Sequence, residues 1–273
     1  MNLSKLDKLS DKNLAEYEKT LIEAYKASLK NIKQEVSSVF EKYSKQGILD
    51  LETMSVKDKN KVTRLTKLID RLNNELNSLN RGRPQELASY LTNQWYQNHD
   101  FTVSEIEKIT GISFNLQPNR EIYNSAVSEL GKIGLESNAN AVKLNIKRAI
   151  TNAIVKGDSI QTMSKDIQKA LETNLNNAVR IARTETTRVV NSSRLEAFEE
   201  AEDLDIKLQK RWISAKDDRT RHTHATLDGK TVDNDKPFVT DNGNQLMYPG
   251  DQSGGASETI SCRCTMVAVL EDE

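Results

Sequence analysis

Apolar residues recur every three or four positions along most of the N-terminal two thirds of the chain. The spacing is clearest in residues 12–45 and 62–79, where Lys, Glu and Gln fill the positions between. This period is typical of amphipathic α-helices that bury one face. In residues 62–79 the spacings alternate between three and four, which is the heptad pattern of a helix–helix seam. The two segments predict an antiparallel hairpin, either inside a helical bundle or as an extended N-terminal arm.

Further helices are predicted over residues 85–100, 138–155, 160–171 and 175–202. Gly131 and Gly134 are expected to interrupt the helical signal that resumes near Arg120, because glycine is a poor helix former. Residues 100–120 combine short apolar runs with Gly111 and Pro118, so we expect short helices or irregular structure there.

The pattern changes after residue 205. Residues 206–213 alternate between apolar and polar side chains, and residues 259–270 contain β-branched residues in a second alternating run. Both runs predict strands. The Asp228-Gly229 pair predicts a tight turn, and Tyr248–Asp251 predicts a type II turn with glycine at its third position. We therefore expect a mainly α protein with a small α+β C-terminal module.

Two domains are predicted from these elements. Residues 1–130 would form a helical arm or bundle, and residues 131–273 an α+β module opened by long helices. The composition agrees, because 29% of the residues are charged, only 5% are aromatic, and the chain has few prolines and glycines. Such a composition favours long helices with solvated faces.

The two cysteines, Cys262 and Cys264, are too few for a disulfide framework, so a reducing compartment is expected. The N-terminus is charged and lacks the apolar core of a signal peptide. No apolar run approaches the length of a membrane span, so no membrane anchor is expected. These features predict a protein made in a cytoplasm, and kept there or packed there into a particle.

The net charge of −1 excludes a general polycation, but positive charge is concentrated locally. Residues 57–83 carry eight basic and three acidic residues. Such a stretch can bind DNA phosphates through counterion release, or can simply be a solvated helix face. The candidate DNA contacts are Lys57, Lys59, Lys61, Arg64, Lys67 and Arg71.

The most informative residues lie in three stretches of the C-terminal third. Residues 181–198 read IARTETTRVVNSSRLEAF, residues 210–232 read KRWISAKDDRTRHTHATLDGKTV, and residues 261–265 read SCRCT. In this order they resemble the phage Mu F-like family of minor head, or head morphogenesis, proteins over about residues 140–270. The residues that carry the resemblance are Arg183, Glu185, Trp212, Asp218, Arg219, His224, Asp228, Gly229 and Arg263.

The resemblance implies a minor capsid protein of a tailed bacteriophage, with no established catalytic activity. Proteins of this family act in procapsid assembly near the portal and in DNA packaging or ejection. The implied location is the virion interior, after assembly in the host cytoplasm. The implied partners are the portal protein and the scaffold or major capsid protein, with double-stranded DNA as a further candidate.

A metal site is one hypothesis for the histidines and cysteines. In extended segments residues i and i+2 point to the same face, so His222 with His224, and Cys262 with Cys264, could surround one Zn²⁺ ion. The alternative is a hydrogen-bonded histidine beside two packed thiols.

The resemblance bears on this metal site as well. Some branches of the family carry C-x-x-C before the LDG sequence and a histidine before the final CRC. Here Arg221 stands at the first cysteine position, His224 at the second, and Thr259 or a neighbour at the histidine position. The family's ligand set is therefore incomplete in this chain.

A cluster of charges on the predicted helix 175–202 suggests a second role. Arg183, Glu185 and Arg188, with Arg180 and Asn191 on nearby turns, could clamp another element through ion pairs. The alternative is a solvated helix face.

An enzyme is the principal rival to the structural role. Asp217, Asp218, Arg219 and Asp228 flank the histidines, and carboxylates beside histidine can bind Mg²⁺ or support hydrolysis. The deaminase, H-E-x-x-H, G-x-S-x-G and P-loop signatures are all absent from the sequence. We therefore predict a structural protein, with a metal-dependent nucleic-acid enzyme and a DNA-binding internal virion protein as the alternatives.

Overall fold

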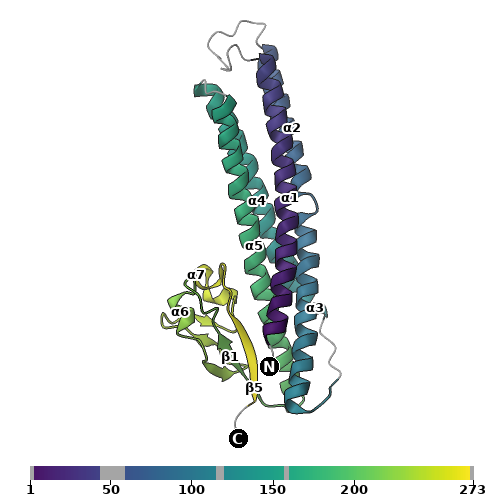
Figure 1. The fold of residues 1–273 in the computed structure, drawn as a ribbon, viewed down its shortest axis with the longest axis vertical. Helices are drawn as coiled ribbons and strands as arrows, with labels where there is room; N and C mark the ends of the chain where they lie inside the picture. The colour runs from purple at the N-terminus through teal and green to yellow at the C-terminus, as the bar shows by residue number, and fades with distance from the viewer. Residues whose placement is uncertain (1–2, 44–58, 115–119, 157–159, 271–273) are drawn as a thin grey trace. The chain divides into compact units, whose positions relative to one another are not determined.

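The computed structural model describes residues 3–43, 59–114, 120–156 and 160–270 (Figure 1). Long helices come first: α1 (Leu3–Tyr43), α2 (Lys59–Asn80), α3 (Arg83–Thr110), α4 (Arg120–Lys156) and α5 (Ile160–Glu202). The remainder contains β1 (Leu208–Ile213), α6 (His222–Ala225), β2 (Thr231–Asp233), β3 (Phe238–Val239), β4 (Gln245–Leu246), the 3₁₀ helix η2 (Gln252–Gly254), α7 (Ala256–Thr259) and β5 (Thr265–Leu270). The predicted fold class, mainly α with a small α+β C-terminal region, is confirmed.

Several helices are longer than their sequence patterns predicted. Helix α3 continues through residues 100–110, where we expected short or irregular structure, because Val103 and Ile106 extend its buried face. Helix α4 passes through Gly131 and Gly134 without ending. Glycine costs a helix only about 1 kcal/mol relative to alanine, which the rest of a long helix can offset. Helix α5 is continuous where two helices were predicted.

By compactness the chain divides into two units. The module unit contains residues 1–17, 86–131 and 180–273, and the helical unit contains residues 18–85 and 132–179. This division does not coincide with the predicted boundary between residues 130 and 131, because α1, α3, α4 and α5 each contribute residues to both units. None of the helices in the described part of the chain combines the length and apolarity needed to cross a membrane.

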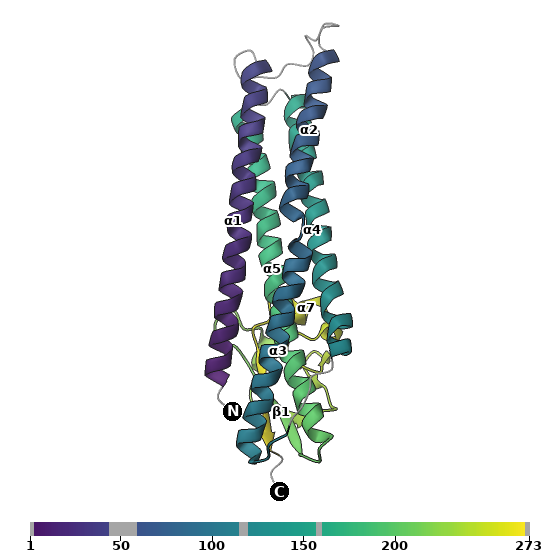
Figure 2. The ribbon, with the colours of Figure 1, turned by 90° about the vertical axis from the view of Figure 1, so that its right-hand side faces the viewer.

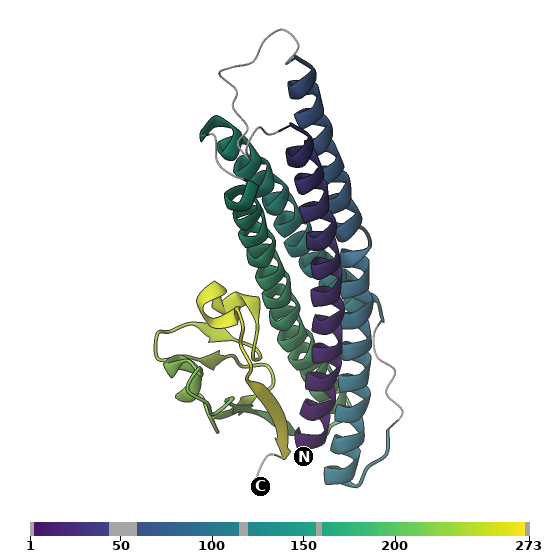
Figure 3. The ribbon, with the colours of Figure 1, turned by 45° about the horizontal axis from the view of Figure 1, so that its top comes forward.

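In the helical unit, α1 and α2 lie side by side and antiparallel, as the hairpin prediction requires (Figure 3). The amide of Asn31 donates to Glu75 at 3.0 Å, and Arg71 donates to Glu35 at 3.2 Å. The heptad residues Leu72, Leu76 and Leu79 are buried. Burial of this seam within the unit agrees with an intramolecular bundle.

Helices α4 and α5 also pair within the helical unit (Figure 2). The side-chain amide of Asn138 donates to the carbonyl oxygen of Asn174 at 2.9 Å, and Asn174 donates to that of Asn138 at 2.8 Å. Both side chains are buried. Because buried amides must keep their hydrogen bonds, this reciprocal pair sets the register of the two helices.

The module unit is built around a three-stranded antiparallel sheet in the order β2-β1-β5. Figure 1 shows this sheet with α6 and α7 gathered beside the C-terminal half of α5. Trp212 of β1 is fully buried and packs edge-on against Phe238 at 5.1 Å between ring centroids. Phe198 of α5 and Ile106 of α3 belong to the same apolar core, so both helices support the sheet.

The predicted type II turn at Tyr248–Asp251 is confirmed. The backbone N–H of Asp251 donates to the carbonyl oxygen of Tyr248 at 3.1 Å, and Gly250 has a φ of 88°. Gly250 also lies against α5, where an added Cβ would be 3.1 Å from the backbone nitrogen of Arg188 and 3.2 Å from its Cα. The turn therefore needs glycine for its conformation and for close contact with the helix.

Replacing Gly250 by alanine tests this contact. We expect G250A to lower the free energy of unfolding by about 2–4 kcal/mol, because backbone strain at positive φ adds to a clash with a backbone that cannot yield. Gly243 is the matched control, since its φ is 80° and an added Cβ would meet no atom within 4 Å. G243A should lose only about 1–2 kcal/mol for the conformation. Urea unfolding followed by circular dichroism would measure both, and equal losses would contradict the proposed contact.

Candidate metal centre and the helix that holds it

A stripe of polar residues on α5 binds the segment that carries the cysteines. Thr184 accepts a hydrogen bond from the backbone N–H of Ser261 at 3.0 Å. Thr187 donates to the carbonyl oxygen of Cys262 at 2.7 Å, and Asn191 donates to that of Cys264 at 3.2 Å. These residues are three and four positions apart, so they share one face of the helix. The helix therefore satisfies the backbone of residues 261–264, which lies between α7 and β5.

Arg194 extends the same stripe by one further turn. Its side chain is fully buried, and its guanidinium donates to the hydroxyl of Thr265 and, at 3.5 Å, to the carbonyl oxygen of Met266. Its other terminal nitrogen contacts the Oδ1 of Asn98 on α3 at 3.4 Å. An arginine can be buried in this way only when several acceptors satisfy its donors.

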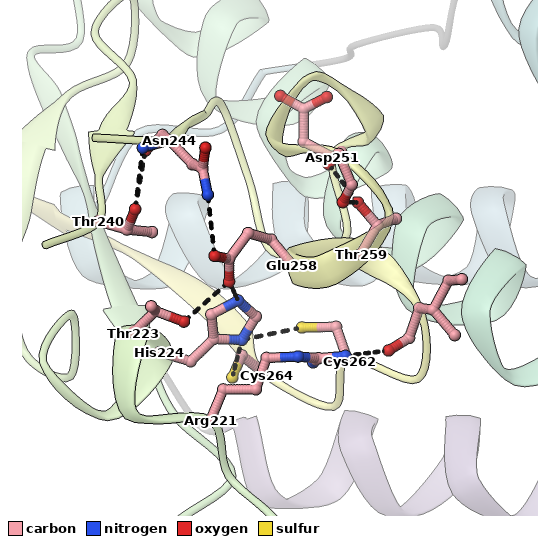
Figure 4. A network of polar contacts seen from close by, with 12 residues as sticks. Arg221, Thr223, His224, Thr240, Asn244, Asp251, Glu258, Thr259, Cys262 and Cys264 are labelled. Atoms are coloured by element: carbon pink, nitrogen blue, oxygen red, sulfur yellow. Dashed lines mark hydrogen bonds and ion pairs between the residues drawn. The ribbon is translucent and has the colours of Figure 1, made fainter. Parts of the chain in front are cut away.

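The segment held by α5 brings both cysteines to His224 of α6 (Figure 4). The three side chains are buried, and their potential ligand atoms all lie within 4.8 Å of one another. The Nδ1 atom of His224 is 3.6 Å from the Sγ of Cys262 and 3.5 Å from that of Cys264. Within the described residues this is the one group of three or more His, Cys, Asp or Glu side chains that could hold a metal ion.

The spacing and chemistry of these donors fit zinc. With Zn–S bonds of about 2.3 Å and Zn–N bonds of about 2.0 Å, tetrahedral coordination places nitrogen and sulfur about 3.5 Å apart. The two observed N–S distances, 3.6 and 3.5 Å, agree with this value. Two sulfurs and one imidazole would supply three ligands, and a fourth would have to come from water or another group.

The two thiols differ in their acidity because they share a hydrogen bond. The pKa of Cys264 is lowered because the thiol of Cys262 hydrogen-bonds to its sulfur. The pKa of Cys262 is raised well above its ordinary value by the same hydrogen bond and by burial. Cys264 is thus the sulfur that ionises first, and the thiolate is the form that binds metals.

His222 does not join this cluster, which corrects the four-residue ligand set predicted from the sequence. The prediction assumed an extended segment, but His222 and His224 lie on the short helix α6. Residues two apart on a helix point in different directions, so only one of the two can face the cysteines. His222 is exposed, and its Nδ1 lies 3.0 Å from a carboxylate oxygen of Asp241.

Arg221 and Thr259 occupy the positions where the family resemblance expected ligands. Arg221 donates to the carbonyl oxygen of Ile260. The hydroxyl of Thr259 donates to the carbonyl oxygens of Asp251 and Gly255 at 2.9 and 2.8 Å. Both side chains make contacts with the backbone of the loop around α7, and a guanidinium has no lone pair for a metal.

The carboxylates of the enzyme hypothesis bind other partners. Asp217 accepts from both terminal nitrogens of Arg263, which holds the pKa of that carboxyl well below its usual range. Asp228 accepts from the backbone N–H of Ser214 at 2.8 Å and lies 3.1 Å from the ammonium of Lys216. Both acids thus hold loops of the module in place.

The remaining motif residues divide between the core and the surface. Asp218 and Arg219 are exposed. Gly229 has a φ of 78°, and its N–H donates to the carbonyl oxygen of Trp212 at 2.8 Å, which places the Asp228-Gly229 turn beside β1 as predicted. Trp212 lies edge-on to the ring of His224 at 5.2 Å, so it forms one wall of the metal cluster.

Half of the predicted charge clamp is buried. Glu185 and Arg188 are 8% and 4% exposed, and the Nε and Nη2 atoms of Arg188 lie 2.8 and 2.7 Å from one oxygen of Glu185. Arg183 and Arg180 are exposed. Of the predicted cluster, Asn191 contacts the segment that carries the cysteines, as one member of the polar stripe, whose spacing of three and four residues was visible in the sequence.

The candidate DNA contacts are only partly described. Lys57 lies outside the described residues, and the side chains of Lys59, Lys61 and Arg64 are not among those described. Lys67 is exposed. The guanidinium of Arg71 pairs with Glu35, which reduces the positive charge available to a phosphate.

The Glu185–Arg188 pair leads to a stability prediction. We expect Glu185→Ala to lower the free energy of unfolding by about 3–5 kcal/mol, because it leaves Arg188 buried without its counter-charge. Arg183→Ala, on the exposed face of the same helix, should change stability by less than about 1 kcal/mol. Chemical unfolding of both variants measures the difference, and similar small effects would show that the pair is not a structural clamp.

Metal content tests the candidate centre directly. We expect protein purified without chelators to retain about one zinc per chain, and His224→Ala and Cys264→Ser each to lose it. His222→Ala is the matched control and should keep the zinc of the wild type. Inductively coupled plasma mass spectrometry provides the measurement, and a wild-type content below about a tenth of an equivalent would rule the site out.

The amino-acid sequence was compared with known protein families and proteins. The family model described as "Phage Mu protein F like protein" matches residues 144–267. The whole chain is 29% identical to the minor head protein GP7 of Bacillus phage SPP1 and covers 88% of that protein. It is also 28% identical, over 97% of its length, to the NAD(+)–arginine ADP-ribosyltransferase EFV of Enterococcus faecalis. The chain spans 54% of that second relative. No solved structure matches the chain.

The matched range corresponds to the stretch where the sequence motifs indicated a resemblance, about residues 140–270. It contains the polar stripe of α5, the His224 cluster, strands β1 and β2, and the first half of β5. Residues 144–267 of this chain therefore match the phage Mu protein F-like family.

Proposed function

We propose that this protein is a minor head protein of a tailed bacteriophage and acts in head morphogenesis. The observation that carries the proposal is the similarity to the SPP1 minor head protein, which extends over the whole chain and over 88% of that relative. A similarity of this extent includes the N-terminal helices, which carry no recognisable motif. The phage Mu F-like region at residues 144–267 supports the same role.

The proposed place of action is the procapsid near the portal, inside the particle. The proposed partners are the portal protein and the scaffold or major capsid protein, and the proposed later steps are DNA packaging and ejection. Support comes from the module, where the charged side chains of Glu185, Arg188 and Arg194 are buried and pair with other groups of the same chain. Such use of charge suits a structural component.

The metal centre has a structural role in this proposal. The segment between β1 and β5 has little regular secondary structure, and both of its cysteines are free thiols. An ion held by His224, Cys262 and Cys264 would connect α6 to the segment that enters β5. Structural zinc sites contribute directly to folding free energy, which would compensate for the small core of such a module.

Co-assembly tests the function. The chain would be expressed with the major capsid, scaffold and portal proteins of the genome that encodes it, and procapsids would be separated on a sucrose gradient. We expect the chain to sediment with the particles, and to be lost when the portal gene is omitted. Mass spectrometry of the gradient fractions measures its amount relative to the capsid protein.

The outcomes of this experiment distinguish the parts of the proposal. Retention in particles that lack the portal would contradict a portal contact and indicate the shell or scaffold. Absence from particles of every composition would contradict the head protein function. Arg183→Ala, which removes an exposed side chain of α5, is a folded variant with an altered surface and serves as the control.

The name of the second relative raises an enzymatic alternative. About half of that protein lies outside the match, so the comparison does not locate its transferase activity in the part shared with this chain. We propose that the shared part is the structural one. Incubation with labelled NAD⁺ and an arginine-rich acceptor should give no transfer, and labelled product that depends on this chain would contradict the proposal.

Contact with DNA is a secondary part of the proposal and concerns the basic stretch 57–83. The exposed ammonium of Lys67 supports it, whereas the pairing of Arg71 with Glu35 weakens it. An interaction of this kind would be electrostatic and would weaken as the salt concentration rises.

A further inference from the structure

His224 presents its two ring nitrogens to two different kinds of group (Figure 4). Its Nδ1 atom faces the sulfurs of Cys262 and Cys264, at 3.6 and 3.5 Å. Its Nε2 atom lies 3.1 Å from a carboxylate oxygen of Glu258 on α7. His224 and Glu258 are only 1% and 3% exposed, so water has little access to either side of the ring.

Glu258 is held in place by two further donors. The hydroxyl of Thr223 donates to its Oε2 at 2.8 Å, and the side-chain amide of Asn244 donates to its Oε1 at 3.0 Å. Both oxygens of Glu258 therefore accept hydrogen bonds from neighbouring side chains. Thr223 is on α6 and Asn244 precedes β4, so the carboxylate is fixed from two directions.

This arrangement decides where the histidine carries its proton. A neutral imidazole has one N–H and one lone pair, and the hydrogen bond at one nitrogen determines the role of the other. If Nε2 were unprotonated, its lone pair would face a carboxylate oxygen in a buried site, which is repulsive and leaves the nitrogen without a donor. A proton on Nε2 is attracted to that oxygen across a contact that has the distance of an ion pair, although not the alignment of a hydrogen bond, and the Nδ1 lone pair is then directed at the two sulfurs.

We propose that Glu258 is a positioning residue that keeps the proton of His224 on Nε2, and thereby directs Nδ1 toward a metal ion shared with Cys262 and Cys264. Histidine ligands commonly donate their second N–H to a carboxylate, which orients the ring and raises its basicity. The role in metal binding rests on the zinc centre proposed above. The position of the proton can be tested in the metal-free protein as well.

The experiment uses the full chain with ¹⁵N-labelled histidine. The chain has three histidines, so long-range ¹H–¹⁵N spectra contain three ring systems, which His222→Asn and His99→Gln would assign. We expect Nε2 of His224 to be protonated in the zinc-free and in the zinc-loaded protein, with Nδ1 changing its shift when zinc is added. An unprotonated Nε2 in either form would overturn the proposal.

Two variants separate positioning from a general effect on folding. Glu258→Gln keeps the size of the side chain but removes the charge and one acceptor oxygen, and should weaken zinc binding about 10- to 100-fold in a chelator competition. Asp241→Asn is the matched control, because Asp241 makes the same kind of contact to His222 on the same helix at the protein surface. It should leave the His224 spectrum unchanged and zinc affinity within about twofold.

The outcomes keep this inference apart from the zinc centre itself. A protonated Nε2 in a protein that binds no zinc would refute the metal centre and its metal-directing role, and leave the Glu258–His224 contact standing. Zinc bound with equal affinity by wild type and Glu258→Gln would leave the metal centre intact and overturn the positioning role. If Glu258→Gln does not fold, the wild-type spectrum still decides the position of the proton.

Discussion

The structure of the module depends on hydrogen bonds that satisfy the backbone of residues 261–264, in a segment where buried Cys262 and Cys264 alternate with exposed side chains. This segment lies against α5, and side chains of that helix provide its hydrogen-bond partners. A buried backbone group without a partner costs about 1–3 kcal/mol, so each lost contact would be expensive. The polar residues on this face of α5 are therefore as important to the fold as the apolar residues beside them.

The other features of the module follow from this contact. Because the segment is fixed on α5, its two cysteines are held close to His224. Strand β5 follows the segment directly and pairs with β1. Gly250 brings the neighbouring turn against the backbone of the same helix. Arg194 links the start of β5 to α3 through Asn98. One helix thus organises the group formed by His224, Cys262 and Cys264, the turn at Gly250 and the strand β5.

This construction bears on the proposed role in a phage head. A protein that must occupy a defined place in an assembly gains from a module whose parts are rigidly connected, and the hydrogen bonds from α5 together with the His224 cluster provide such connections. Both kinds of contact are short-range and largely buried, so they are little affected by salt. Exposed charges such as that of Lys67 lie on the helical unit and take no part in these contacts.

The sequence by itself determined the periodic elements and the family. The three-and-four spacing of apolar residues predicted the helices, and the ordered motifs between residues 181 and 265 predicted the Mu F-like region that the comparison confirmed. These features are local, because helical periodicity and motif order can be recognised without knowing which segments meet. The type II turn at Gly250 was predictable for the same reason.

Only the tertiary structure decided which of these residues come together. It placed His222 at the surface and His224 beside the cysteines, because α6 is a helix rather than an extended segment. It brought Glu258 of α7 to His224 of α6, a contact across 34 positions that no local pattern indicates. It also joined the predicted helical pieces into the continuous α3, α4 and α5, since buried contacts outweigh the weak helix preference of individual residues.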